Sequence, residues 1–148
     1  MNQTIKYSFI ILFITIVNIT SYGQTEADRV IGIWQTEEKD AKFDIYKSGN
    51  KYYGKLIWGK NLFESDGKTP KKDHKNPDPK LRSRLLLNLV LLNGFVYDDG
   101  SWEDGTIYDP KSGKTYSCEM ELVNGRLKIT GYIGITLLGR TVTWDRVK

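Results

Sequence analysis

The feature that most constrains the fold is a pair of short patterns near the two ends of the chain. Gly32 precedes Trp34 by two residues on an expected first strand, and Arg146 lies on an expected last strand. In a small closed β-barrel the first and last strands pair, which leaves the sheet without edges. A guanidinium stacked on an indole would then plug one end of the barrel. We therefore predict that Gly32, Trp34 and Arg146 close one end of a barrel.

The rest of the sequence consists of short alternating segments with turn residues roughly every ten positions, which is typical of an all-β sandwich or barrel. Two Asn-Gly pairs, 93–94 and 124–125, suit type I′ hairpin turns because both central residues need a positive φ. Such tight hairpins favour an antiparallel up-and-down barrel of eight or nine strands. The expected strands span residues 30–36, 42–46, 51–58, 85–92, 95–97, 102–108, 114–123, 126–133 and 137–147.

One long loop interrupts the tight connections. The segment from Gly59 to Arg84 contains three of the four prolines and shows no strand or helix periodicity. A loop of this length in a compact domain is usually a lid, a binding loop or a disordered segment. Its part between residues 68 and 84 is also rich in lysine and arginine.

The first 23 residues predict a cleaved secretory signal. Lys6 precedes an apolar run over residues 8–20, and small residues follow at Ser21 and Gly23. That run is shorter than the roughly 20 residues that span a bilayer. We expect residues 24–148 to form one exported domain, periplasmic or secreted, with no transmembrane segment.

Composition excludes several classes of function. Without Lys6 the formal charge falls from +4 to +3, too little for the footprint of a nucleic-acid-binding protein. The single histidine, His74, and the single cysteine, Cys118, cannot build a structural zinc site within one chain. Cys118 alternates with apolar residues, so we expect it to be buried and inert. We predict no metal and no cofactor.

Five ordered motifs resemble a known family. They lie at residues 53–56 (Tyr-Gly-Lys-Leu), 73–77 (Asp-x-x-Asn-Pro), 102–116, 131–134 (Gly-Tyr-Ile-Gly) and 138–146 (Leu-Gly-Arg-Thr-x-x-Trp-x-Arg). Together they are similar to the bacterial exported family called domain of unknown function 2147, or DUF2147. This resemblance covers nearly all of residues 24–148. It implies a lipocalin-like β-barrel in a periplasmic or secreted protein, and it implies no established activity.

Arg140 is the most informative candidate for ligand binding. If Val142 and Trp144 face the barrel interior, strand alternation turns Arg140 inward as well, towards the end away from Trp34. An inward arginine is costly unless it is paired. The sequence leaves two roles open: an ion pair with an internal carboxylate, Asp44 or Asp109, or contact with a negative group of a ligand.

Several aromatic and polar residues complete the candidate ligand site. Small barrels use aromatic rings either to fill the interior or to line a ligand cavity, and the sequence does not separate these roles. Asp73 and Asn76 can cap turns next to prolines or contact a ligand. The candidates beside Arg140 are Trp102, Tyr53, Trp58, Tyr132, Asp73 and Asn76.

Three functions follow from these patterns. The first is a binding protein that holds a small amphipathic or apolar ligand in the barrel cavity. The second is an envelope interaction protein that uses the basic loop 68–84 to contact an anionic polymer or a protein partner. The third is a hydrolase, but no catalytic grouping is recognisable. We expect the acidic segment 98–105 to form a solvated hairpin tip.

Overall fold

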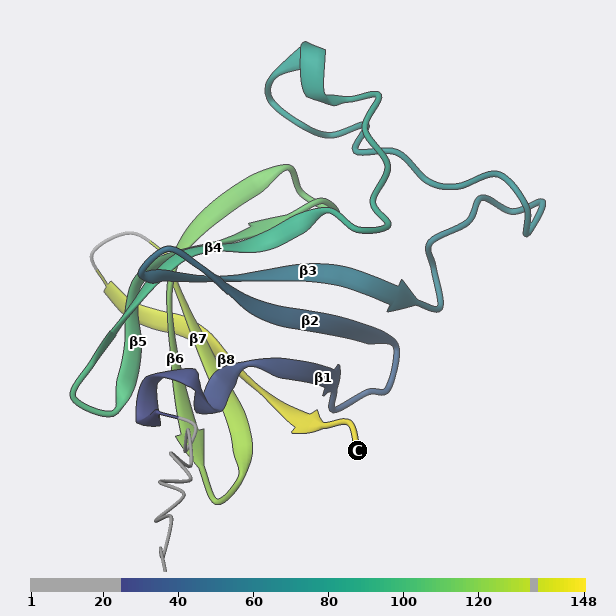
Figure 1. Cartoon of the computed structure of the whole chain (residues 1–148). Helices are drawn as coiled ribbons and strands as arrows, with labels where there is room; N and C mark the ends of the chain where they lie inside the picture. The colour runs from purple at the N-terminus through teal and green to yellow at the C-terminus, as the bar shows by residue number, and fades with distance from the viewer. Residues whose placement is uncertain (1–24, 134–135) are drawn as a thin grey trace, which may run out of the picture.

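The computed structural model describes residues 25–133 and 136–148, which form one closed antiparallel barrel (Figure 1). Each strand pairs with the next, and β1 pairs with β8 through Trp34 opposite Arg146. The predicted up-and-down barrel is confirmed, with eight strands. These are β1 (Gly32–Thr36), β2 (Ala41–Ser48), β3 (Lys51–Gly59), β4 (Val90–Asp98), β5 (Ser101–Asp109), β6 (Lys114–Val123), β7 (Arg126–Ile133) and β8 (Thr136–Arg146).

A short 3-10 helix, η1 (Glu26–Val30), precedes the first strand, where the sequence predicted that the strand itself would already begin. The prediction that the first strand begins at residue 30 is therefore wrong by two residues. Thr25 caps η1 by accepting a hydrogen bond from the amide of Asp28. Gly32 then takes a φ of +137°, which redirects the chain into β1.

The two Asn-Gly pairs have different structures. Asn124 and Gly125 have φ values of 52° and 78° and form the predicted turn between β6 and β7. The predicted turn at Asn93-Gly94 is wrong, because β4 runs through both residues. Gly94 has a φ of +73° inside the strand, opposite a register shift in β3. A positive φ serves a β-bulge as well as a hairpin turn, and here tertiary pairing selects the bulge.

The long loop extends further than predicted, from residue 60 to residue 89. Residues 85–89, expected to be part of a strand, lie outside β4. The amide of Asn88 donates to the carbonyl of Leu56 at 2.7 Å, and that of Leu56 donates to Leu89 at 2.9 Å. A second short 3-10 helix, η2 (Pro79–Leu81), lies within this loop.

The barrel interior is filled by apolar side chains over much of its length. Phe43 and Trp144 stack with ring centroids 4.3 Å apart. Phe95 covers Gly105 so closely that a Cβ there would lie 2.3 Å from the ring. Cys118 is buried among these residues, as predicted. The fully buried large side chains include Trp34, Trp102, Tyr52, Phe95, Ile45, Leu92, Met120, Leu127 and Ile129.

The predicted signal segment, residues 1–23, lies outside the described residues. Within the residues that the structure describes, no helix has the length and apolar character needed to cross a membrane.

Candidate functional site

One end of the barrel is closed by η1 together with the first and last strands. The Arg146 guanidinium lies 4.2 Å from the centroid of the Trp34 ring, and its Nη1 donates to the carbonyl of Ile31 at 2.9 Å. Glycine suits position 32 because its φ of +137° is one that other residues rarely adopt, and because a Cβ there would lie 2.7 Å from that Nη1. The indole of Trp34 in turn donates to Val30 at 2.8 Å. The three residues predicted to close the barrel thus lie together.

Trp102 belongs to this closed end. Its ring is buried, and its Nε1 donates to the carbonyl of Ala27 in η1 at 3.0 Å. The hydroxyl of Tyr52 donates to Asp28 at 2.7 Å, while Lys47 pairs with the same carboxylate at 2.9 Å. Together these contacts fix η1 over the barrel. Trp102 therefore fills the closed end rather than lining a cavity.

The opposite end carries the long loop, which we call the cover segment (residues 60–89). Figure 1 shows this segment extending from the ends of β3 and β4, beyond the barrel itself. Two isolated antiparallel bridges organise it, Phe63 with Pro70 and Lys72 with Leu85. The amide of Lys71 also donates to Leu62, and that of Leu86 donates to Lys71. The cover segment is therefore an ordered layer of three short extended stretches.

A buried carboxylate attaches the cover segment to the barrel. Asp73 is fully buried, and its Oδ1 accepts a 2.5 Å hydrogen bond from the hydroxyl of Tyr108 in β5. Its Oδ2 accepts from Asn76 at 2.8 Å and from Arg84 Nη2 at 2.8 Å. The Arg84 guanidinium also lies 5.6 Å from the centroid of the Tyr108 ring. This cluster, Asp73, Asn76, Arg84 and Tyr108, is called the anchor cluster below.

The anchor cluster holds Asp73 in its charged form. Burial alone would raise the pKa of Asp73, but the hydrogen bonds from Tyr108, Asn76 and Arg84 outweigh it and lower that pKa. Burial, then the neighbouring Asp73 carboxylate, raises the pKa of Tyr108, so its hydroxyl remains a donor. Both oxygens of Asp73 are occupied by protein donors. Asp73 and Asn76 therefore serve as a structural attachment in this structure.

A backbone contact reinforces this attachment at the β5–β6 turn. Gly113 has a φ of +72°, and a Cβ there would lie 2.0 Å from the carbonyl oxygen of Lys75. Only glycine allows the cover segment to approach the turn this closely. The cover segment is thus held against the barrel by both the anchor cluster and the 110–113 turn.

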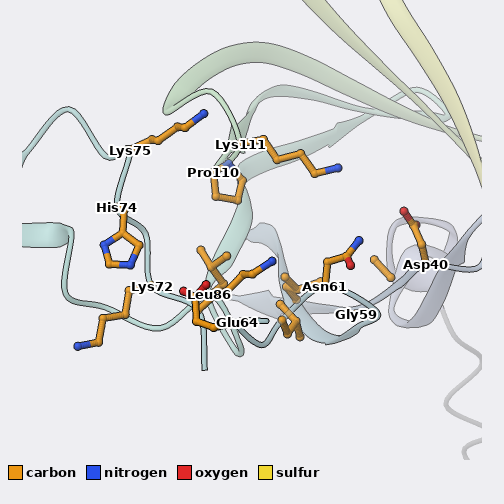
Figure 2. Close-up of a pocket in the computed structure, with 14 residues that line it drawn as sticks. Asp40, Gly59, Asn61, Glu64, Lys72, His74, Lys75, Leu86, Pro110 and Lys111 are labelled. Atoms are coloured by element: carbon orange, nitrogen blue, oxygen red, sulfur yellow. The ribbon is translucent and has the colours of Figure 1, made fainter. Parts of the chain in front are cut away.

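Between the cover segment and the barrel rim lies a cavity of about 440 Å³. Figure 2 shows side chains from the cover segment, the end of β3 and the β5–β6 turn around it. Its apolar lining comes from Ala41, Leu56, Leu62, Leu86 and Pro110. Its volume lies within the range of roughly 300–1,000 Å³ that is usual for small-molecule sites.

The charged groups around this cavity are predominantly basic. Lys71, Lys72, Lys75 and Lys111 line it together with His74, against the carboxylates of Asp40 and Glu64. Asp40 is further engaged by the hydroxyl of Thr36 at 2.7 Å. The site therefore combines an apolar surface with an excess of positive charge, which suits a molecule with both an apolar part and an anionic group.

Arg140 lies outside this cavity. Its pairing with Gly131 places it in the inward-facing row of Cys118, as alternation predicted, yet its side chain is exposed. The structure does not support an ion pair with Asp44, which pairs with Lys55 at 3.2 Å. Asp109 instead accepts from the amide of Lys111 at 2.9 Å. The Arg140 side chain makes no ion pair or hydrogen bond with any residue that the structure describes.

The three remaining aromatic candidates lie on the outside of the barrel. Tyr53 stacks on Tyr46 with ring centroids 5.8 Å apart. Trp58 is 42% exposed, with Lys42 over its ring at 5.6 Å. A hydrogen bond to Glu119, then burial, raises the pKa of Tyr132 to about 12. The structure brings none of these three rings to the cavity.

The structure contains little that resembles a catalytic grouping. His74 is exposed at the edge of the cavity, beside lysines rather than a carboxylate partner. Among the described residues, no three metal-binding side chains are grouped closely enough to hold an ion. Burial raises the pKa of the Cys118 thiol to about 12, which keeps it protonated and unreactive at neutral pH.

Sequence reasoning missed Tyr108 and Arg84 as partners of Asp73. Tyr108 was within one of the family-like motifs, but nothing in that motif links it to a residue 35 positions earlier. From the sequence, the lysines of the long loop were identified only as a cluster of positive charge. No local pattern shows that Lys71 and Lys75 line a cavity with Lys111.

Comparison with known proteins agrees with the fold. The family model described as "Uncharacterized protein conserved in bacteria (DUF2147)" matches residues 32–146. Among solved structures, the chain is similar to HP1028 from the human pathogen Helicobacter pylori, described as belonging to the lipocalin family. The two share 30% sequence identity with a TM-score of 0.68, over 80% of this chain and 82% of HP1028. No curated protein matches.

Proposed function

Because the chain belongs to the DUF2147 family and its barrel matches a lipocalin, we propose that it is an exported protein that binds a small amphipathic molecule. The site is the cavity beneath the cover segment. The molecule would carry one anionic group and an apolar part. This proposal rests most directly on one observation, the apolar cavity surface surrounded by lysines.

The arrangement of the lining supports this polarity. Leu56, Leu62 and Leu86 offer an apolar surface, and each methylene that leaves water there contributes about 0.8 kcal/mol to binding. Lys71 and Lys75 lie in the cover segment, and Lys111 lies in the turn that it contacts. An anionic group placed among these ammonium groups is favoured electrostatically, and more strongly at low salt.

Native mass spectrometry of residues 24–148, purified from the natural host, tests the proposal. We expect a reproducible added mass that is lost in the Lys71→Glu/Lys75→Glu variant. The matched control is Lys51→Glu/Lys148→Glu, two exposed lysines outside the cover segment, which should retain the added mass. A chain without bound mass under these conditions would contradict the proposal.

The same experiment distinguishes the cavity from Arg140. Arg140→Ala removes the exposed arginine of the inward row and leaves the cavity lining unchanged. If the anionic group is held under the cover segment, Arg140→Ala retains the added mass. Loss of the mass in Arg140→Ala alone would instead place the anionic group beside Arg140 on β8.

A further inference from the structure

The cover segment has two faces of different character. In its extended stretches, pairing places Phe63 opposite Pro70 and Lys72 opposite Leu85. Since alternate residues of an extended chain point to opposite sides, these four share one face, and of them only Lys72 also lines the cavity. The intervening residues, Leu62 and Lys71, belong to the other face. Burial agrees, because Leu62 is buried and Phe63 is exposed.

The outward face exposes large apolar side chains. Phe63 is 44% exposed and Leu85 is 45% exposed, and neither lines the cavity. Leu87, two residues after Leu85, and Leu81 in η2 are also exposed. Four of the seven exposed large apolar residues that the structure describes therefore lie in this one segment. Such clustering is typical of an interaction surface.

The same segment carries the positive charge of the domain. Residues 60–89 contain eight lysines and arginines against four acidic residues, a net charge of +4. Since residues 24–148 carry +3 in total, the remainder carries −1. Lys68 and Lys80 are exposed and make no ion pair with any described residue. These cations are therefore free to act on a partner.

We propose that the outward face of the cover segment docks on an anionic lipid bilayer. Apolar side chains that enter the boundary between headgroups and acyl chains, surrounded by lysines that meet anionic headgroups, are what such a surface recognises. A soluble polyanion would account for the lysines but would leave Phe63 and Leu85 without a favourable environment. The presence of both kinds of exposed side chain in this one segment favours the bilayer.

This proposal goes beyond ligand binding in the cavity and does not depend on it. Figure 1 shows that the cover segment extends beyond the ends of β3 and β4, on the side of the barrel away from β1 and β8.

Vesicle co-sedimentation of residues 24–148 tests the docking surface. The two vesicle preparations are phosphatidylcholine alone and phosphatidylcholine mixed with phosphatidylglycerol. We expect binding to the anionic vesicles only, weakened by salt. Phe63→Ser/Leu85→Ser should weaken it roughly tenfold or more, since two large apolar side chains lose their insertion. Lys68→Glu/Lys80→Glu should weaken it by at least about tenfold.

Matched variants outside the cover segment provide the controls. Ile33→Ser/Val123→Ser removes two side chains of similar exposure, 39% and 40%, and should leave binding unchanged. Lys51→Glu/Lys148→Glu makes the same charge change elsewhere and should have a much smaller effect. All substituted residues are exposed, so the variants should fold, and far-UV circular dichroism verifies this.

Three results would overturn the proposal. The first is no binding to phosphatidylglycerol vesicles. The second is binding that Phe63→Ser/Leu85→Ser leaves intact. The third is equal binding to soluble dextran sulfate, lost only in the lysine variant, which would assign the surface to a soluble polyanion. Neither Phe63 nor Leu85 lines the cavity, so a negative vesicle result would not contradict ligand binding in the cavity, which native mass spectrometry tests separately.

Discussion

The two ends of this barrel are closed by different physical means. At one end η1 contributes Val30 to the core beside the buried Trp34 ring, and the exposed guanidinium of Arg146 lies 4.2 Å from the centroid of that indole. At the other end a layer of 30 residues is attached through a buried, hydrogen-bonded carboxylate, Asp73, and borders a cavity of about 440 Å³. The first end is filled by side chains, whereas the second retains a cavity beside the attached layer.

The two ends are therefore stabilised by different kinds of interaction. The closed end depends on apolar burial that is shared with the strands, so it should unfold only with the whole barrel. The cover segment contributes few residues to the core and is held by polar contacts at a small number of points. Segments of this kind can open locally at a free energy below that of global unfolding.

The largest expected effect concerns the closed end. Trp34→Ala removes a fully buried indole and the partner of Arg146, and should lower the free energy of unfolding by about 4 kcal/mol. Urea denaturation measures this loss. Trp58→Ala is the matched control, because its ring is 42% exposed and should contribute less than about 1 kcal/mol. Equal losses in the two variants would contradict the assignment of Trp34 as the central residue of the closed end.

The second largest effect should be a loss of stability that is confined to the cover segment. Asp73→Ala leaves Arg84, Tyr108 and Asn76 without their buried acceptor, which should cost about 3 kcal/mol. Amide hydrogen exchange should show this as lost protection in residues 61–89, with a smaller change at Ile129 in the core. Asp98→Ala, at the exposed hairpin tip on the other rim, should change neither. A uniform loss across the barrel would mean that the two ends are not separable.

A smaller effect isolates the contact between the cover segment and the β5–β6 turn. Ala at position 113 would place a Cβ 2.0 Å from the carbonyl oxygen of Lys75, in addition to the strain of a φ of +72°. Gly125→Ala has a similar φ of +78° but no atom within 4 Å. We expect about 1 kcal/mol of destabilisation for Gly125→Ala and about 2 kcal/mol or more for Gly113→Ala. Thermal denaturation compares them, and equal values would mean that the contact is unimportant.

The smallest expected effect is the pH dependence of the attachment of the cover segment through Asp73. The folded pKa of Asp73 lies below the ordinary value of 3.8, so its stabilising contribution is present above pH 3.8 and is lost as pH falls through the folded pKa. The protection of the cover segment against amide exchange should therefore decrease as the pH is lowered below 3.8. In Asp73→Asn this dependence should be largely absent. A wild-type cover segment unaffected down to the acid unfolding of the barrel would contradict the role of Asp73.

The fold and the closed end could be predicted because their determinants are periodic or forced by topology. Closing the barrel requires β1 beside β8, so residues near the two ends of the chain, Trp34 and Arg146, become neighbours. Trp58 was harder to predict, because one irregularity reverses the direction of the side chains that follow it in the strand. The register shift at Lys42/Phe43 turns Trp58 outward, although strict alternation would place it with Leu56.

The covered end could not be predicted, because its contacts join residues that no local pattern relates. Asp73 meets Arg84 from 11 residues away and Tyr108 from 35 residues away. The sequence identified Asp73 and Asn76 as polar residues next to prolines, and Asn76 does cap a turn by accepting from the amide of Asp78 at 2.9 Å. Their burial against Tyr108 depends on the path of the whole cover segment.

We propose that the end beside the cover segment, and not the closed end, binds an amphipathic anion. An NMR titration of ¹⁵N-labelled residues 24–148 with laurate tests it most directly. We predict saturable amide shifts concentrated at Leu62, Lys71, Lys75 and Lys111, with little change at Tyr52 and Trp102, and loss of these shifts in Lys71→Glu/Lys75→Glu. Shifts centred on the closed end, or none at any laurate concentration below its aggregation threshold, would contradict the account.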